Sequence, residues 1–151
     1  MRKLVLALLV LFASPHAARA EAIGIGLFLG EPSGLDLKIG LGRRSALDIV
    51  IGQDSFRDSR TDYMHLTYLL TPFVANGRSV LVPLRIGIGA AAIGVVDDNA
   101  HVAVRIPLEI GFRFRRTPLE IYGEVAIKGT FVEEDFMTFD VDGGLGIRFY
   151  F

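Results

Sequence analysis

A histidine and a threonine two residues apart, His65 and Thr67, are the side chains best suited to acid–base or nucleophilic chemistry. A hydroxyl nucleophile needs a base and an orienting group in contact with it, and no third carboxylate is placed beside this pair. A second candidate, 140–143 (Asp-Val-Asp-Gly), resembles the start of a calcium-binding loop. Such a loop needs a glutamate near its twelfth position, which here is Phe151. We therefore expect no catalytic residue, no metal site and no cofactor.

Charged residues that alternate with apolar ones are the dominant pattern of the chain. From Phe139 to Phe151 every odd position is apolar or glycine, whereas the even positions include Asp140, Asp142 and Arg148. A period of two describes a β-strand between two unlike environments. The same separation recurs in earlier segments. The charged face carries Asp36, Lys38, Asp48, Arg85, Arg105, Glu109, Arg113, Glu120, Glu124, Lys128, Asp140, Asp142 and Arg148.

Eight strand-like runs separated by turn residues account for the chain after residue 20. They span about 23–30, 35–41, 46–53, 63–71, 80–94, 101–114, 119–132 and 137–151. Several of these runs exceed the roughly 9–11 residues that a tilted strand needs to cross a bilayer. No apolar run after residue 20 approaches the roughly 20 residues of a membrane helix.

The two faces of these strands decide the environment of the sheet. A water-soluble barrel would have to enclose nearly all the branched aliphatic residues in an interior of limited size. A membrane barrel instead exposes them to lipid and fills its interior with polar side chains. Phenylalanines on the apolar face gather toward the strand ends, as in the aromatic girdles of such barrels. They are Phe112, Phe114, Phe149 and Phe151 at one end, and Phe131 and Phe139 at the other. We predict an all-β fold, an eight-stranded antiparallel up-and-down transmembrane β-barrel.

The N-terminus predicts export. Residues 1–3 (Met-Arg-Lys) are positively charged, residues 4–13 are an unbroken apolar run, and residues 18–20 (Ala-Arg-Ala) form a small-x-small cleavage site. This pattern is typical of a cleaved signal peptide over residues 1–20, which leaves 21–151 as an outer-membrane β-barrel. The chain has no cysteine, so it has neither disulfides nor thiolate metal sites. The exported part is mildly acidic, which argues against binding nucleic acid.

Charges removed from water must pair, and the strand register predicts how. If 133–135 form a three-residue loop, Lys128 faces Asp140 and Glu120 faces Arg148, and we predict these two ion pairs. A four-residue loop before residue 119 places Arg113 opposite Glu120, which would be favourable, but it also places Glu109 opposite the like-charged Glu124. The register of these two strands therefore stays open. The predicted interior network comprises Lys128, Asp140, Glu120, Arg148, Arg105, Glu109, Arg113 and Glu124.

The two ends of the predicted barrel differ in charge. With an even number of strands, both termini lie on the periplasmic side. The periplasmic turns then hold Arg43, Arg44, Arg78, Arg115 and Arg116. The outward loops hold Glu31, Asp54, Asp58, Asp62, Asp97, Asp98, Glu133, Glu134 and Asp135, against Arg57 and Arg60. The acidic loops are candidates for contact with an extracellular partner, or with lipopolysaccharide through bridging cations.

Four segments resemble a family of small bacterial outer-membrane proteins of unassigned function, OmpX-like in architecture and first noticed in spirochaetes. They are 30–35 (GEPSGL), 104–108 (VRIPL), 118–121 (PLEI) with Glu124, and 143–151 (GGLGIRFYF). The resemblance implies an eight-stranded barrel and carries over no catalytic or ligand residue. The outward loops here are short, which leaves little protruding sheet for adhesion. Apolar residues near the C-terminus also resemble the sorting signal that the barrel-assembly machinery reads; they are Leu145, Ile147, Phe149 and Phe151.

The expected function is that of a non-enzymatic, monomeric barrel of the bacterial outer membrane, surrounded by lipid and lipopolysaccharide, with a structural or surface-interaction role. Two alternatives stay open. The charge ladder would suit a narrow ion or proton pore. His65 and Thr67 would suit a lipid-modifying hydrolase, since some eight-stranded outer-membrane lipid A deacylases use a His-x-Ser pair on one strand.

Overall fold

The computed structural model describes residues 23–54, 61–96, 100–132 and 136–151. The predicted signal peptide lies outside these ranges. So do most residues of the predicted acidic loops, namely Asp58, Asp97, Asp98, Glu133, Glu134 and Asp135, together with Arg57 and Arg60.

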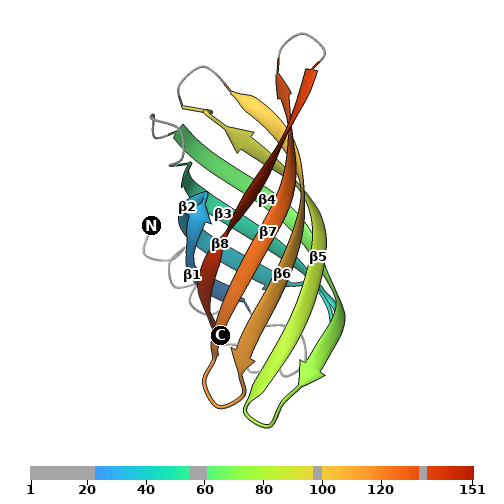
Figure 1. The fold of residues 1–151 in the computed structure, drawn as a ribbon. Coiled ribbons are helices and arrows are strands. Elements are labelled where there is room, and N and C mark those ends of the chain that lie inside the picture. Colours follow the sequence, from blue (N-terminus) through green and yellow to red (C-terminus); the bar gives the residue numbers. More distant parts are fainter. Residues whose placement is uncertain (1–22, 55–60, 97–99, 133–135) are drawn as a thin grey trace, which may run out of the picture.

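The described residues form eight strands and no helix (Figure 1). The strands are β1 (Gly24–Glu31), β2 (Ser33–Gly40), β3 (Ser45–Asp54), β4 (Thr61–Asn76), β5 (Val80–Ile93), β6 (His101–Phe114), β7 (Leu119–Val132) and β8 (Phe136–Tyr150). Each strand pairs antiparallel with the next in sequence, and β8 pairs with β1 to close the barrel. The prediction of an all-β, eight-stranded, antiparallel up-and-down barrel is confirmed.

The largest difference from the predicted strands lies at the end of β4, which was predicted to end at residue 71. Pro72, which follows the predicted run 63–71, was expected to begin a turn because proline has a fixed φ that suits turns. In the structure β4 continues to Asn76, and its register against β5 shifts between Leu70 and Phe73. Such a bulge leaves an extra residue out of the pairing, which is where a strand tolerates proline. The turn is therefore confined to residues 77–79, closed by a hydrogen bond from the Gly77 amide to the Val80 carbonyl (2.9 Å).

The interior of the barrel is polar and its outer face is apolar. Eleven of the thirteen residues predicted for the charged face are buried; the exceptions are Arg113, which is half-buried, and Asp140, which is exposed. Apolar side chains of the other parity are exposed, among them Leu35 (64%) and Val141 (61%). The alternation along each strand thus separates two environments, as predicted, with the charges inside.

Glycines on β8 make room for two aromatic rings inside the barrel. Phe28 of β1 and Tyr122 of β7 stack with ring centroids 5.9 Å apart. A Cβ on Gly146 would lie 2.1 Å from two ring atoms of Tyr122, and one on Gly144 would lie 2.7 Å from the Phe28 ring. Only residues without a side chain let these rings lie against the strand.

The barrel wall is uneven in height. β8 pairs with β1 only from Gly143 to Tyr150, so its residues 136–142 rise beyond β1. Figure 1 shows the β7–β8 hairpin projecting at one end, whereas the C-terminus lies at the other, beside the β4–β5 and β6–β7 turns. Residues at the projecting end consequently have fewer neighbours than those in the middle.

Replacing Gly146 with alanine tests this packing. We expect Gly146→Ala to lower the free energy of unfolding by about 1–3 kcal/mol, since the added methyl group overpacks a filled interior. The matched control is Gly123→Ala on β7, where a Cβ meets nothing closer than 3.4 Å. Urea unfolding in detergent micelles measures both variants. Equal stability of the two would contradict the packing of Tyr122 on Gly146.

Candidate functional site: a buried network of arginines and carboxylates

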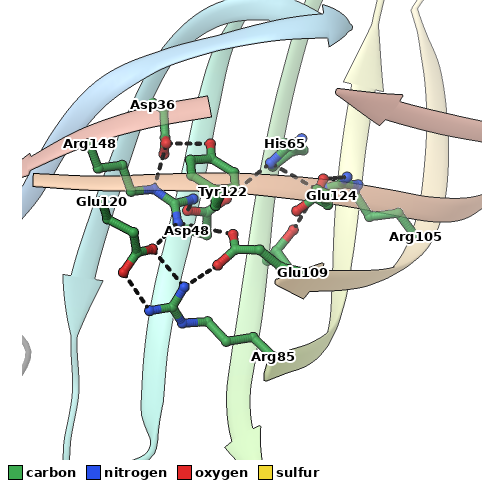
Figure 2. A network of polar contacts seen from close by, with 11 residues as sticks. Asp36, Asp48, His65, Arg85, Arg105, Glu109, Glu120, Tyr122, Glu124 and Arg148 are labelled. Atoms are coloured by element: carbon green, nitrogen blue, oxygen red, sulfur yellow. Dashed lines mark hydrogen bonds and ion pairs between the residues drawn. The ribbon is translucent and has the colours of Figure 1, made fainter. Parts of the chain in front are cut away.

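Arg148 of β8 is the centre of the interior network (Figure 2). Its guanidinium group donates to carboxylates on three other strands: from Nε to Asp36 Oδ2 (2.5 Å), from Nη2 to Asp48 Oδ1 (2.6 Å) and from Nη1 to Glu109 Oε2 (3.0 Å). Its Cζ lies 3.7 Å from the ring centroid of Tyr122. Each guanidinium nitrogen has a carboxylate partner, which is what a charge removed from water requires.

Glu120 connects this centre to a second arginine. Arg85 of β5 donates two hydrogen bonds to Glu120, from Nη1 (2.7 Å) and from Nη2 (2.9 Å), and also contacts Glu109. The two residues come from β5 and β7, and they meet over Gly111 of β6. A Cβ there would lie 3.1 Å from both Arg85 Nη1 and Glu120 Cδ. The predicted Glu120–Arg148 pair is in register, with 3.6 Å between Oε1 and Nη1, but the hydrogen bonds of Glu120 go to Arg85.

Arg105 of β6 organises the residues of the hydrolase alternative. It donates to Glu124 (2.5 Å), to the Thr67 hydroxyl (3.1 Å) and to His65 Nε2 (2.9 Å). Arginine can only donate, so His65 accepts at Nε2 and its proton lies on Nδ1. The imidazole is therefore neutral, and the 3.5 Å approach of Asp48 Oδ2 to the same nitrogen is a contact without a hydrogen bond. A nucleophile–base pair would need Thr67 to donate to His65; here both are bound by Arg105.

The predicted Lys128–Asp140 ion pair is wrong, although its register is right. Lys128 and Asp140 face each other across β7 and β8, but Lys128 Nζ donates to Asp142 instead (2.8 Å). Asp140 lies on the part of β8 that rises beyond β1, where its side chain is exposed and accepts a hydrogen bond from the Val141 amide. Water solvates the carboxylate there, whereas the buried Asp142 needs a cation.

The register left open by the sequence is now defined. Both Arg113–Glu120 and Glu109–Glu124 are opposite pairs. The two glutamates do not conflict, because Glu109 binds Arg85 and Arg148 while Glu124 binds Arg105. Among the described residues, no ion pair joins Arg113 to Glu120. The Arg113 guanidinium instead lies 4.1 Å from the ring centroid of Tyr150, at the C-terminal end of β8.

Sequence reasoning missed the contacts that cross the interior. Asp36, Asp48 and Arg85 were assigned to the charged face but not to the network, and Tyr122, which donates to Asp36 Oδ2 (2.5 Å), was not considered. Pairing of neighbouring strands cannot reveal contacts between β8 and β2 or β3. The available signal was the small interior of an eight-stranded barrel, in which long side chains reach the opposite wall.

The network is nearly neutral as a whole. Its buried carboxylates are Asp36, Asp48, Glu109, Glu120, Glu124 and Asp142, and its buried cations are Lys38, Arg85, Arg105, Lys128 and Arg148. Six carboxyl groups thus face five basic side chains. Within the described ranges, no group of three or more His, Asp or Glu side chains could hold a metal ion. The arrangement neutralises and fills the interior.

No protein-family model, curated protein or solved structure matches this chain. In the part of the chain that the structure describes, no helix is long and apolar enough to cross a membrane.

Replacing Arg148 with methionine tests the network. We expect Arg148→Met to lower the free energy of unfolding by about 3–5 kcal/mol, because it leaves buried carboxylates uncompensated. The loss should shrink at acidic pH, where protonation removes the unpaired negative charge. Arg113→Met is the matched control, since this half-buried arginine lies against the Tyr150 ring and joins no ion pair among the described residues. Denaturant unfolding at two pH values measures both variants; equal losses would contradict the central role of Arg148.

Proposed function

We propose that this chain is a non-enzymatic β-barrel of the bacterial outer membrane, held by a charge-filled interior, with a structural or surface-interaction role. The observation that carries the proposal is the inverted polarity of the barrel. Charged residues such as Arg148 and Arg85 are fully buried, whereas large apolar side chains are exposed on every strand. Soluble monomers rarely expose an apolar patch beyond a few hundred Å², and lipid is the environment in which such a face is stable.

The closed backbone supports the same proposal. β8 pairs with β1 from Gly24 to Glu31, so the ladder has no open edge along this seam. In a hydrocarbon environment every backbone N–H and C=O group must find a partner within the protein, which closed barrels achieve. Among sheet structures, closure is thus the feature that membrane insertion requires.

Aromatic residues at both ends of the outer face add support. Phe112, Phe149 and Phe151 are exposed near one end, and Phe131 and Phe139 near the other. Aromatic rings are enriched at both interfaces of a bilayer. The aliphatic band between them matches the expected hydrocarbon layer.

The two ends of the sequence supply a route to that membrane. Residues 1–20 resemble a signal peptide, which would export the chain. Leu145, Ile147, Phe149 and Phe151, the proposed assembly signal, are all exposed on the outer face of the barrel. An assembly partner can therefore reach them without disturbing the interior network.

The surface-interaction part of the role falls to the acidic end. Glu31, Asp54, Asp62 and Asp140 lie at the end of the barrel opposite the C-terminus, and none of them is buried. An extracellular partner with basic groups would complement this end. The network itself supports a structural role, because it fills the interior and contains no nucleophile activated by a free base.

Cell fractionation tests the proposal. Expressed with residues 1–20, the protein should appear in the outer-membrane fraction and should migrate differently in gels before and after boiling, because a folded barrel resists detergent. A fully soluble periplasmic protein with unchanged migration would contradict the proposal.

Conductance measurements address the pore alternative. We expect the purified protein to give no conductance steps in planar bilayers, because Arg148 and its partners occupy the interior from wall to wall. Arg148→Ala should be compared under identical conditions. Reproducible steps from the unaltered protein would favour the pore over the structural role.

A further inference from the structure

Five exposed arginines gather at one end of the barrel. They lie in the β2–β3, β4–β5 and β6–β7 turns, and we call them the arginine collar: Arg43, Arg44, Arg78, Arg115 and Arg116. An up-and-down topology brings these three turns to the same end, and Figure 1 shows two of them beside the C-terminus. The turns at 41–44, 77–79 and 115–118 contain no aspartate or glutamate. The collar therefore presents a concentrated positive charge.

Hydrogen bonds fix the turns that carry the collar. Arg115 Nε donates to the Gly77 carbonyl (3.0 Å) and its Nη2 to Asn76 Oδ1 (3.2 Å), which ties the β6–β7 turn to the β4–β5 turn. The Thr71 amide donates to the Arg44 carbonyl (2.8 Å), which ties β4 to the β2–β3 turn. Arg115 is thus a structural member of the collar. The side chains of the other four arginines have no partner among the described residues.

A band of exposed phenylalanines adjoins the collar. Phe73 of β4, Phe112 and Phe114 of β6, and Phe149 and Phe151 at the end of β8 are all exposed near the same end. Aromatic side chains of membrane proteins lie at the headgroup level. If the outer face contacts lipid, as proposed above, the arginines just beyond this band of phenylalanines lie at the depth of the lipid phosphates.

We propose that the arginine collar binds the phosphate headgroups of anionic phospholipids in the leaflet at this end. A guanidinium group can bind a phosphate through two parallel hydrogen bonds, and basic residues beside a bilayer attract anionic lipids. The turns are three or four residues long, so they hold the arginines close to the band of phenylalanines rather than extending them toward a soluble partner. The collar would therefore fix the depth of the barrel.

Lipid selectivity tests this proposal. The unaltered protein is inserted into phosphatidylcholine vesicles that contain a trace of spin-labelled phosphatidylglycerol or spin-labelled phosphatidylcholine. We expect the labelled phosphatidylglycerol to be preferred by about fivefold or more, with the preference falling as salt is added. Equal contact with both labels would overturn the proposal. Insertion is measured separately, by the change in gel migration on heating. Equal contact with both labels would therefore leave the proposed membrane location standing, whereas failure to insert would overturn both proposals.

A charge-neutral variant isolates the collar. Arg43→Gln, Arg44→Gln, Arg78→Gln and Arg116→Gln are combined, while Arg115 is kept because it bonds the turns together. The variant should insert and shift on heating like the unaltered protein, but should lose the preference for phosphatidylglycerol. The matched control combines Glu31→Gln and Asp140→Asn at the opposite end and should keep the preference. A collar variant that still prefers phosphatidylglycerol would overturn the proposal.

Discussion

A guanidinium group deprived of water must find hydrogen-bond partners inside the protein, and the position of Arg148 on the last strand makes this demand a constraint on the whole barrel. Its partners Asp36, Asp48 and Glu109 come from β2, β3 and β6. They can surround Arg148 only when β8 lies against β1. Closing the barrel and pairing Arg148 with the carboxylates of β2 and β3 therefore depend on each other, and a barrel left open at this seam would leave both these charges and backbone groups unpaired.

The space for this network comes from residues without side chains. Gly111 lets Arg85 and Glu120 meet across β6, and Gly146 lets the Tyr122 ring lie against β8, beneath the Arg148 guanidinium. An eight-stranded barrel encloses little volume, so large side chains such as Arg85 and Tyr122 need a residue without a side chain beside them. The glycines and the buried charges are consequently two parts of one packing solution.

The sequence was sufficient to predict the fold and the side of the sheet on which each charge lies, because a strict period of two admits only two phases. It also predicted the register of β7 and β8 from the length of one loop. It could not predict which charges meet, since long side chains such as that of Arg148 reach across the interior to strands that are not neighbours. Lys128 shows the limit. Its opposite residue is Asp140, but Asp140 lies on the part of β8 that extends beyond β1 and is exposed, so Lys128 pairs with Asp142 instead. Pro72 shows another, because a bulge admits a proline that a regular ladder would exclude.

The proposed lipid contact of the outer face is open to direct measurement, because the chain has no cysteine of its own. Single cysteines at Val104, Ile106 and Leu108, consecutive outward positions of β6, can each carry a nitroxide without entering the network. In the membrane-reconstituted protein all three labels should be relaxed by oxygen dissolved in the lipid and shielded from a water-soluble nickel chelate, whereas a label at Ser79 in the β4–β5 turn should show the reverse. Labels at the three strand positions that meet the chelate as readily as Ser79 would contradict the inverted polarity on which the proposed function rests.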